Sequence, residues 1–214
     1  MSMVDGFNSM ARKVPVWAIY ALGAVPAALL VAQIATGDLG VDPVKTVEQR
    51  LGVVGLQFLL AGLMISPLRQ WAGLNLLRFR RAIGLLAFAY IALHLTTWLV
   101  LDIQLRWSEI WADILKRPYV TVGMAGFVAL LPLAITSNNA SVRRLGAAAW
   151  KRLHKLTYVA AFAGALHYLM LVKAWPIEPI LYFGVMLGLL TLRVVGNRSV
   201  AKRTEPKRQD MQTG

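Results

Sequence analysis

The chain has 214 residues, of which 57% are hydrophobic, and its 23 basic and 10 acidic residues give a formal net charge of +13. High apolar content with strong positive charge excludes an ordinary water-soluble domain. Because the sequence has no cysteine, it also excludes disulfides, thiolate-bound iron–sulfur clusters, cysteine-based zinc sites and covalent c-type haem attachment. The basic excess indicates contact with an anionic membrane surface rather than with nucleic acid.

Six apolar segments predict membrane-spanning helices, because a helix needs about 20 apolar residues to cross about 30 Å of hydrocarbon. The last of them carries Glu178 and Arg193 near its ends, where long charged side chains reach the headgroups. The first could be a secretory signal, but it exceeds the usual signal core of about 7–15 residues, which favours a retained span. We therefore expect an all-α integral membrane protein, a six-helix transmembrane bundle. Its predicted spans are about 14–35, 51–68, 82–101, 118–137, 153–172 and 176–196.

The distribution of lysine and arginine predicts the orientation, since basic residues near spans are retained on the cytoplasmic side. The N-terminal segment 1–13, the loops after the second and fourth spans and the C-terminal end hold 17 of the 23 basic residues. The other loops hold 6, including Lys173, together with seven of the ten acidic residues. We expect both termini in the cytoplasm, one membrane domain over residues 14–196, and a basic, disordered cytoplasmic tail over residues 197–214.

Two histidines, His94 and His167, are the only ionisable residues predicted to lie well away from every span end. Both spans run outward from the cytoplasm, and a rise of about 1.5 Å per residue places both imidazoles roughly 18–20 Å from the cytoplasmic boundary. Two imidazoles at one depth on different helices suit a haem bound from both sides. The alternative is that each histidine only forms a hydrogen bond between helices. The absence of a mid-membrane carboxylate argues against an ion-coupled transporter.

A third histidine, His154, is predicted to lie at the cytoplasmic start of the fifth span. It precedes His167 by 13 residues, which corresponds to about 20 Å along an ideal helix but about 140° around it. The matching position in the third span is Arg81, which is not a haem ligand. We expect His154 either to be one ligand of a second haem or to border a quinone or flavin site. Arg78, Arg80 and Arg81 are first of all cytoplasmic anchors, and alternatively partners of haem propionates or of a flavin phosphate.

Two blocks of sequence carry a family resemblance. The first is GLNLLRFRRAIG at 73–84, which leads to Tyr90 and His94; the second runs from Arg143 through WKRLHKLTY at 150–158 to LHY at 166–168 and Lys173. Together with PLAITSN at 132–138, these blocks resemble the MsrQ family, the haem-binding membrane subunits of bacterial methionine sulfoxide reductase systems. The resemblance extends from the first span to the last.

The resemblance implies a ferric-reductase-like transmembrane domain, related to that of the NADPH oxidases, in the bacterial inner (plasma) membrane. It implies one bis-histidine haem b on His94 and His167. The pattern departs at Arg81, where a second haem would need its histidine, so His154 carries over only as a candidate ligand of that haem. The resemblance also implies FMN, although no phosphate-binding loop in the sequence places it.

The resemblance further implies a non-catalytic electron-transfer subunit. The donor would be the quinone pool or a cytosolic flavin reductase, because the residues after the last span are too few for a flavin domain. The acceptor would be a periplasmic molybdenum enzyme, MsrP, that reduces methionine sulfoxide in proteins, docking on the loops around Asp38–Arg50 and Asp102–Arg117. Two alternatives stay open: a transmembrane ferric or metal reductase, and a cofactor-free membrane assembly protein.

Overall fold

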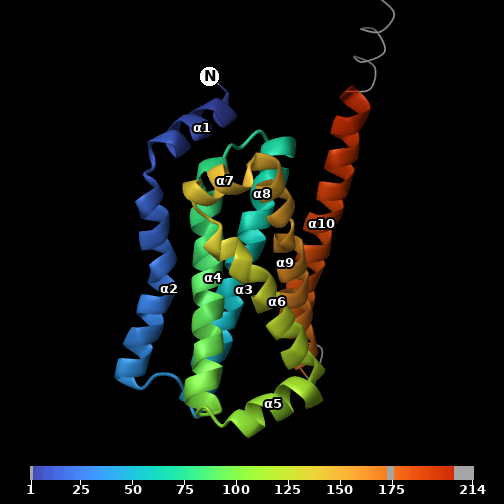
Figure 1. Cartoon of the computed structure of the whole chain (residues 1–214). Coiled ribbons are helices and arrows are strands. Elements are labelled where there is room, and N and C mark those ends of the chain that lie inside the picture. The colour runs from blue at the N-terminus through green and yellow to red at the C-terminus, as the bar shows by residue number, and fades with distance from the viewer. Residues whose placement is uncertain (1, 173–175, 205–214) are drawn as a thin grey trace, which may run out of the picture.

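The protein is a bundle of long helices. The computed structural model describes residues 2–172 and 176–204, and all regular structure within these ranges is helical. Five helical segments there are long and apolar enough to cross a membrane, and they stand side by side (Figure 1). They are α2 (Val16–Thr36), α3 (Pro43–Trp71), the segment Leu77–Asp102 made of η1 (Leu77–Phe79), α4 (Arg80–Thr97) and η2 (Trp98–Asp102), α6 (Pro118–Ile135), and Ile177–Val195 of α10 (Ile177–Thr204). The chain is therefore a multi-pass membrane protein.

The predicted fifth span is shorter in the structure than in the sequence-based prediction. Helix α9 (Leu156–Leu171) has 16 residues, about 24 Å at a rise of about 1.5 Å per residue. A separate helix, α8 (Ala147–Leu153), precedes it, and the chain turns at His154. The all-helical membrane fold is thus confirmed, whereas six crossings with both termini in the cytoplasm stay a prediction.

Three further short helices lie in segments for which no helix was predicted: α1 (Met3–Lys13), α5 (Trp107–Lys116) and α7 (Asn139–Leu145). Helix α1 has a capping box, in which the Asp5 N–H donates to Ser2 Oγ at 3.1 Å and the Ser2 N–H donates to the Asp5 carboxylate at 3.0 Å. The hydrogen bonds from Ser2 lower the pKa of Asp5. Helix α5 lies across one end of the bundle and joins α4 to α6 (Figure 1).

The C-terminal end also differs from the prediction. Helix α10 continues to Thr204, so residues 197–204 are helical rather than disordered. The rest of the predicted tail, residues 205–214, and the predicted loop residue Lys173 lie outside the described residues.

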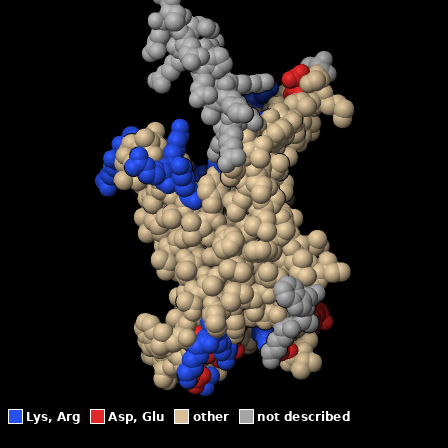
Figure 2. Space-filling view, turned by 90° about the vertical axis from the view of Figure 1, so that its right-hand side faces the viewer, with Lys and Arg blue, Asp and Glu red and all other residues tan. Residues whose placement is uncertain are grey.

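The core is formed where α3 and α9 meet α4, α6 and α10. Helix α9 contributes small residues, Ala160, Ala161, Ala163 and Ala165, all buried, so its neighbours approach closely. Large apolar side chains of α3, among them Leu56, Leu60 and Leu63, fill the space against α9 and α10. Figure 2 shows charged side chains at the two ends of the visible face, with a broad uncharged belt between them, as expected of a surface in contact with lipid.

Candidate functional site

His94 of α4 and His167 of α9 lie opposite each other inside the bundle. Their ring centroids are 6.2 Å apart and the ring planes are inclined at 72°. A metal ion lies about 2.0 Å from an imidazole nitrogen, which is itself about 1.1 Å from its ring centroid, so two imidazoles on opposite sides of one ion have centroids roughly 6 Å apart. The distance between the two rings therefore leaves room for one metal ion.

Each of these rings is held through Nδ1 by a main-chain carbonyl. Nδ1 of His94 lies 2.8 Å from the carbonyl oxygen of Glu48, and Nδ1 of His167 lies 2.7 Å from that of Tyr119. Because a carbonyl only accepts, Nδ1 is the donor, and Nε2 of the neutral ring keeps its lone pair. Metal-binding histidines are usually fixed in this way by a hydrogen bond from the other ring nitrogen. Both histidines therefore have the tautomer that a metal ligand requires.

The two carbonyls come from equivalent places in the fold. Helices α3 and α6 both begin with a proline, and Glu48 and Tyr119 lie within their first two turns. This is the end of the bundle at which α5 lies (Figure 1). Sequence analysis missed both residues, and no side-chain pattern could have found them, because every residue carries a carbonyl.

The side chains available as ligands limit which metal group this site can bind. Among residues 2–172 and 176–204, no group of three or more His, Cys, Asp or Glu side chains lies together as a metal site. Two imidazoles alone do not complete the four-ligand shell of a structural zinc site. They do suffice for a haem iron, which brings four nitrogens of its own and needs only axial ligands. His94 and His167 thus fit a haem iron better than a free ion.

His154 is not part of this pair. It lies between α8 and α9, where its ring stacks on Trp150 with centroids 3.8 Å apart. Its Nε2 is 3.2 Å from Thr136 Oγ1, and the Thr136 hydroxyl donates to the carbonyl of Pro132, so Nε2 of His154 is the donor. Burial lowers the pKa of His154, and the positive charges of Arg80 and Arg81 lower it further. The neutral ring therefore offers Nδ1 rather than Nε2 to a ligand, unlike the other two histidines.

The three arginines predicted as anchors or anion partners lie at the opposite end of α4 from His94. Arg78 donates to the carbonyls of Ala11 and Arg12 and so fixes α1 against the bundle. Arg81 donates to the side-chain oxygen of Asn139 at 2.9 Å. Arg80 and Arg81 both lie near His154, as their effect on its pKa shows.

A fourth arginine at this end was not predicted as a site residue. The guanidinium of Arg193 in α10 lies over the ring of Tyr158, 5.1 Å from its centroid. Its Nη1 is buried and has no hydrogen-bond partner among the residues that the structure describes. A buried guanidinium N–H is costly to leave unpaired, so this end of the bundle fits an anionic group such as a carboxylate or a phosphate.

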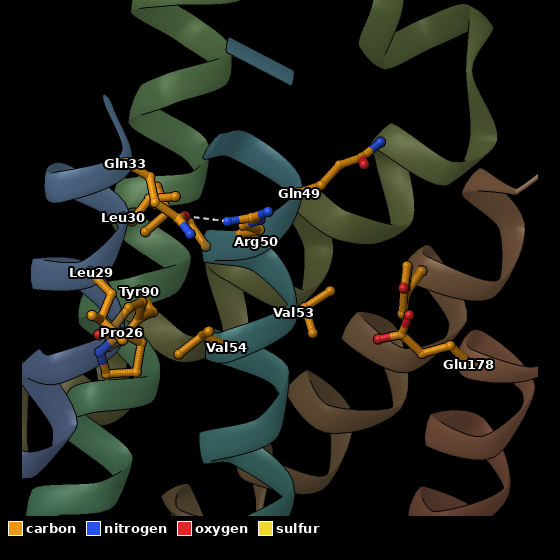
Figure 3. A pocket seen from close by; sticks show the side chains of 12 residues that line it. Pro26, Leu29, Leu30, Gln33, Gln49, Arg50, Val53, Val54, Tyr90 and Glu178 are labelled. Atoms are coloured by element: carbon orange, nitrogen blue, oxygen red, sulfur yellow. Dashed lines mark hydrogen bonds between the residues drawn. The ribbon is translucent and has the colours of Figure 1, made fainter. Parts of the chain in front are cut away.

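A cavity of about 440 Å³ lies around the N-terminal half of α3. Apolar residues form much of its wall, and Gln33, Gln49, Arg50, Tyr168 and Glu178 contribute polar groups. Arg50 donates to the side-chain oxygen of Gln33 on one side of α3, and Glu178 of α10 lies on the other side (Figure 3). Tyr168 directly follows His167 in α9, but neither His94 nor His167 lines this cavity.

Comparison with known proteins agrees with this geometry. Residues 50–165, which include His94 and all of α4 and α6, match the family described as ferric reductase like transmembrane component. The site and the fold thus define a ferric-reductase-like membrane protein.

Named relatives make the assignment narrower. "Protein-methionine-sulfoxide reductase heme-binding subunit MsrQ" of Brucella anthropi is 49% identical over 191 residues, which cover 89% of this chain and 86% of the relative. The proteins of the same name from Brucella ovis and Brucella canis are each 49% identical over 178 residues, covering 83% of this chain and 80% of the relative. The chain belongs to the MsrQ family.

Proposed function

We propose that this chain binds haem b through His94 and His167 and acts as the electron-transfer subunit of a methionine sulfoxide reductase system. The observation that carries the proposal is the histidine pair itself, with ring centroids 6.2 Å apart and both Nδ1 atoms engaged by carbonyls. The relatives named as heme-binding subunits support it.

The haem, when bound, supplies one-electron oxidation and reduction within the membrane. The residues of this chain do the rest. His94 and His167 would hold the haem iron through Nε2, the Glu48 and Tyr119 carbonyls hold the rings through Nδ1, and the packed apolar helices exclude water. The chain itself then forms and breaks no bond of the sulfoxide.

We place the electron acceptor at the end of the bundle at which α5 lies. The acceptor is the periplasmic catalytic subunit MsrP, and its docking surface consists of α5 and the segment Asp38–Arg50. Support comes from the nearness of the histidine pair to this end and from the exposed Arg106–Glu109 ion pair of α5, at 3.1 Å. The other end, at which α1 lies and α10 ends, lies in the cytoplasm.

Two places suit the electron donor and further cofactors. The cavity around α3, apolar with a few polar groups, has the character of a site for a quinone. At the cytoplasmic end, His154 with Arg80, Arg81 and Arg193 suits FMN, through its phosphate, or the propionates of a second haem. A cytosolic flavin reductase would deliver its electrons at that end.

The family match favours one alternative, a transmembrane reductase of ferric iron, which uses the same haem and differs only in the acceptor. Electron delivery from the reduced chain to purified MsrP, compared with delivery to a ferric chelate, separates the two functions.

The visible absorption spectrum of the chain purified from haem-replete cells tests the proposal. We expect a Soret band and the spectrum of a six-coordinate, low-spin iron. A colourless protein would overturn the proposal in favour of a cofactor-free assembly protein.

A further inference from the structure

The two helix pairs that carry the histidines are built alike, although the sequence shows no repeat. In each pair, the imidazole of the second helix (α4 or α9) contacts a carbonyl in the first helix (α3 or α6). A glycine follows that carbonyl by four residues: Gly52 follows Glu48, and Gly123 follows Tyr119.

These glycines lie directly against the rings. A Cβ atom added at Gly52 would be 3.1 Å from Nδ1 of His94 and 3.3 Å from its Cε1. At Gly123 the corresponding distances to His167 are 2.8 Å and 3.1 Å. Cβ contacts below 3.0 Å essentially never occur in proteins. Any other residue at 123 would therefore displace the ring, and at 52 the ring would have to shift by a few tenths of an ångström.

Helix geometry explains why glycine is needed at this spacing. The carbonyl of residue i accepts from the N–H of residue i+4, one turn further on, and keeps a second lone pair. Because the Cα–Cβ bond tilts toward the N-terminus of a helix, a Cβ at residue i+4 leans over that carbonyl. It would occupy the space through which the imidazole Nδ1 approaches. Glycine leaves this approach open.

We propose that Gly52 and Gly123 are positioning residues for the two axial imidazoles. By admitting the Nδ1–H···O=C hydrogen bonds, they fix the tautomer and orientation of each ring and keep Nε2 strongly basic. A more basic ligand stabilises ferric over ferrous iron, so the two glycines lower the reduction potential of the haem. This inference rests on the proposed haem site.

The experiment compares Gly52→Ala and Gly123→Ala with Gly126→Ala in the full chain. Gly126 lies on the same helix as Gly123, and its added Cβ would meet Ala163 Cβ at 3.1 Å, a contact as tight as that at Gly52 but away from both rings. Gly62→Ala, whose added Cβ would lie 3.6 Å from Ile83, is the loose control. The measurements are the low-spin electron paramagnetic resonance signal, the reduction potential and the melting temperature.

We expect Gly52→Ala to keep its haem with a shifted low-spin signal and a more positive potential. Gly123→Ala should show a larger shift of both, or loss of the low-spin signal, because its clash is the closer one. Gly126→Ala and Gly62→Ala should keep the wild-type signal and potential, whatever their melting temperatures. The inference is overturned if the first two variants match Gly126→Ala in signal and potential, or if neither folds while Gly126→Ala does.

Failure of the haem proposal would be visible separately. If the wild-type chain is purified without haem, the proposed function fails, and the same variants are compared by nuclear magnetic resonance of ¹⁵N-labelled histidine. Nδ1–H signals of His94 and His167 that change only in Gly52→Ala and Gly123→Ala would uphold the positioning role alone. Unchanged signals would overturn that role as well.

Discussion

The hydroxyl of Tyr90 in α4 bridges two main-chain groups of α2. The hydroxyl donates to the carbonyl of Gly23 at 2.7 Å and accepts from the N–H of Ala27 at 3.0 Å. In a regular α-helix the Ala27 N–H would donate directly to the Gly23 carbonyl, so the hydroxyl is inserted into that hydrogen bond. Tyr90 is only 3% exposed. One side chain thus ties α2, at the left of the bundle in Figure 1, to α4.

We expect Tyr90→Phe to destabilise the protein by about 1–3 kcal/mol, because it leaves the buried Gly23 carbonyl and the part-buried Ala27 N–H without their partner. Thermal unfolding in detergent measures the effect. Tyr20→Phe, which removes the hydroxyl of an exposed tyrosine of α2, is the control. Equal melting temperatures for the two variants would contradict the prediction.

His94→Ala and His167→Ala should each abolish the low-spin signal of a bis-histidine haem, because each removes one axial nitrogen. His154→Ala should leave that signal largely intact, since His154 instead contacts Trp150 and Thr136. Haem content and axial-ligand spectroscopy of the three variants provide the test. Equal loss in all three would refute the assignment of the ligands.

Arg193→Gln should weaken binding of an anionic cofactor at the cytoplasmic end, because it removes a guanidinium whose buried Nη1 has no hydrogen-bond partner among the described residues. A charge-assisted hydrogen bond is worth roughly 1.5–3 kcal/mol, so we expect about a tenfold or larger loss of affinity. The FMN and haem contents of the purified variant measure it, with Arg69→Gln, an exposed arginine at the end of α3, as the control. Unchanged contents would remove Arg193 from the site.

The exposed aromatic residues of α5 should lie in the headgroup region of the membrane. Trp107, Trp111 and Leu115 are exposed at successive turns, whereas Ile110 is buried against the bundle, a pattern typical of helices at the lipid interface. Lipids brominated near the headgroup should quench wild-type fluorescence more than the Trp107→Tyr/Trp111→Tyr variant. An equal loss of fluorescence intensity per mole of the two proteins would show that these side chains face water.

The sequence predicted those features of the molecule that depend on the length of its apolar segments and on residue type. It predicted the long apolar helices, and it singled out His94 and His167, whose rings face each other in the structure. It was misleading where it assumed one continuous helix. The angle of about 140° between His154 and His167 was calculated for an ideal helix, but the chain turns between α8 and α9. Arg78 was predicted as a cytoplasmic anchor or an anion partner, and that stays a prediction; its bonds to the carbonyls of Ala11 and Arg12 are a tertiary contact that no local pattern encodes.

The hydrogen bonds that hold the two imidazoles have a consequence for genetics. Their acceptors are the main-chain carbonyls of Glu48 and Tyr119. Alanine substitution at either position therefore keeps the carbonyl and does not remove the hydrogen bond. Replacing the amide that follows either residue by an ester, which makes the carbonyl a poorer acceptor, would reach them. At Tyr119 the side chain has a second role, because its ring lies 6.0 Å from that of His167, so only the ester separates the carbonyl's contribution from that of the ring.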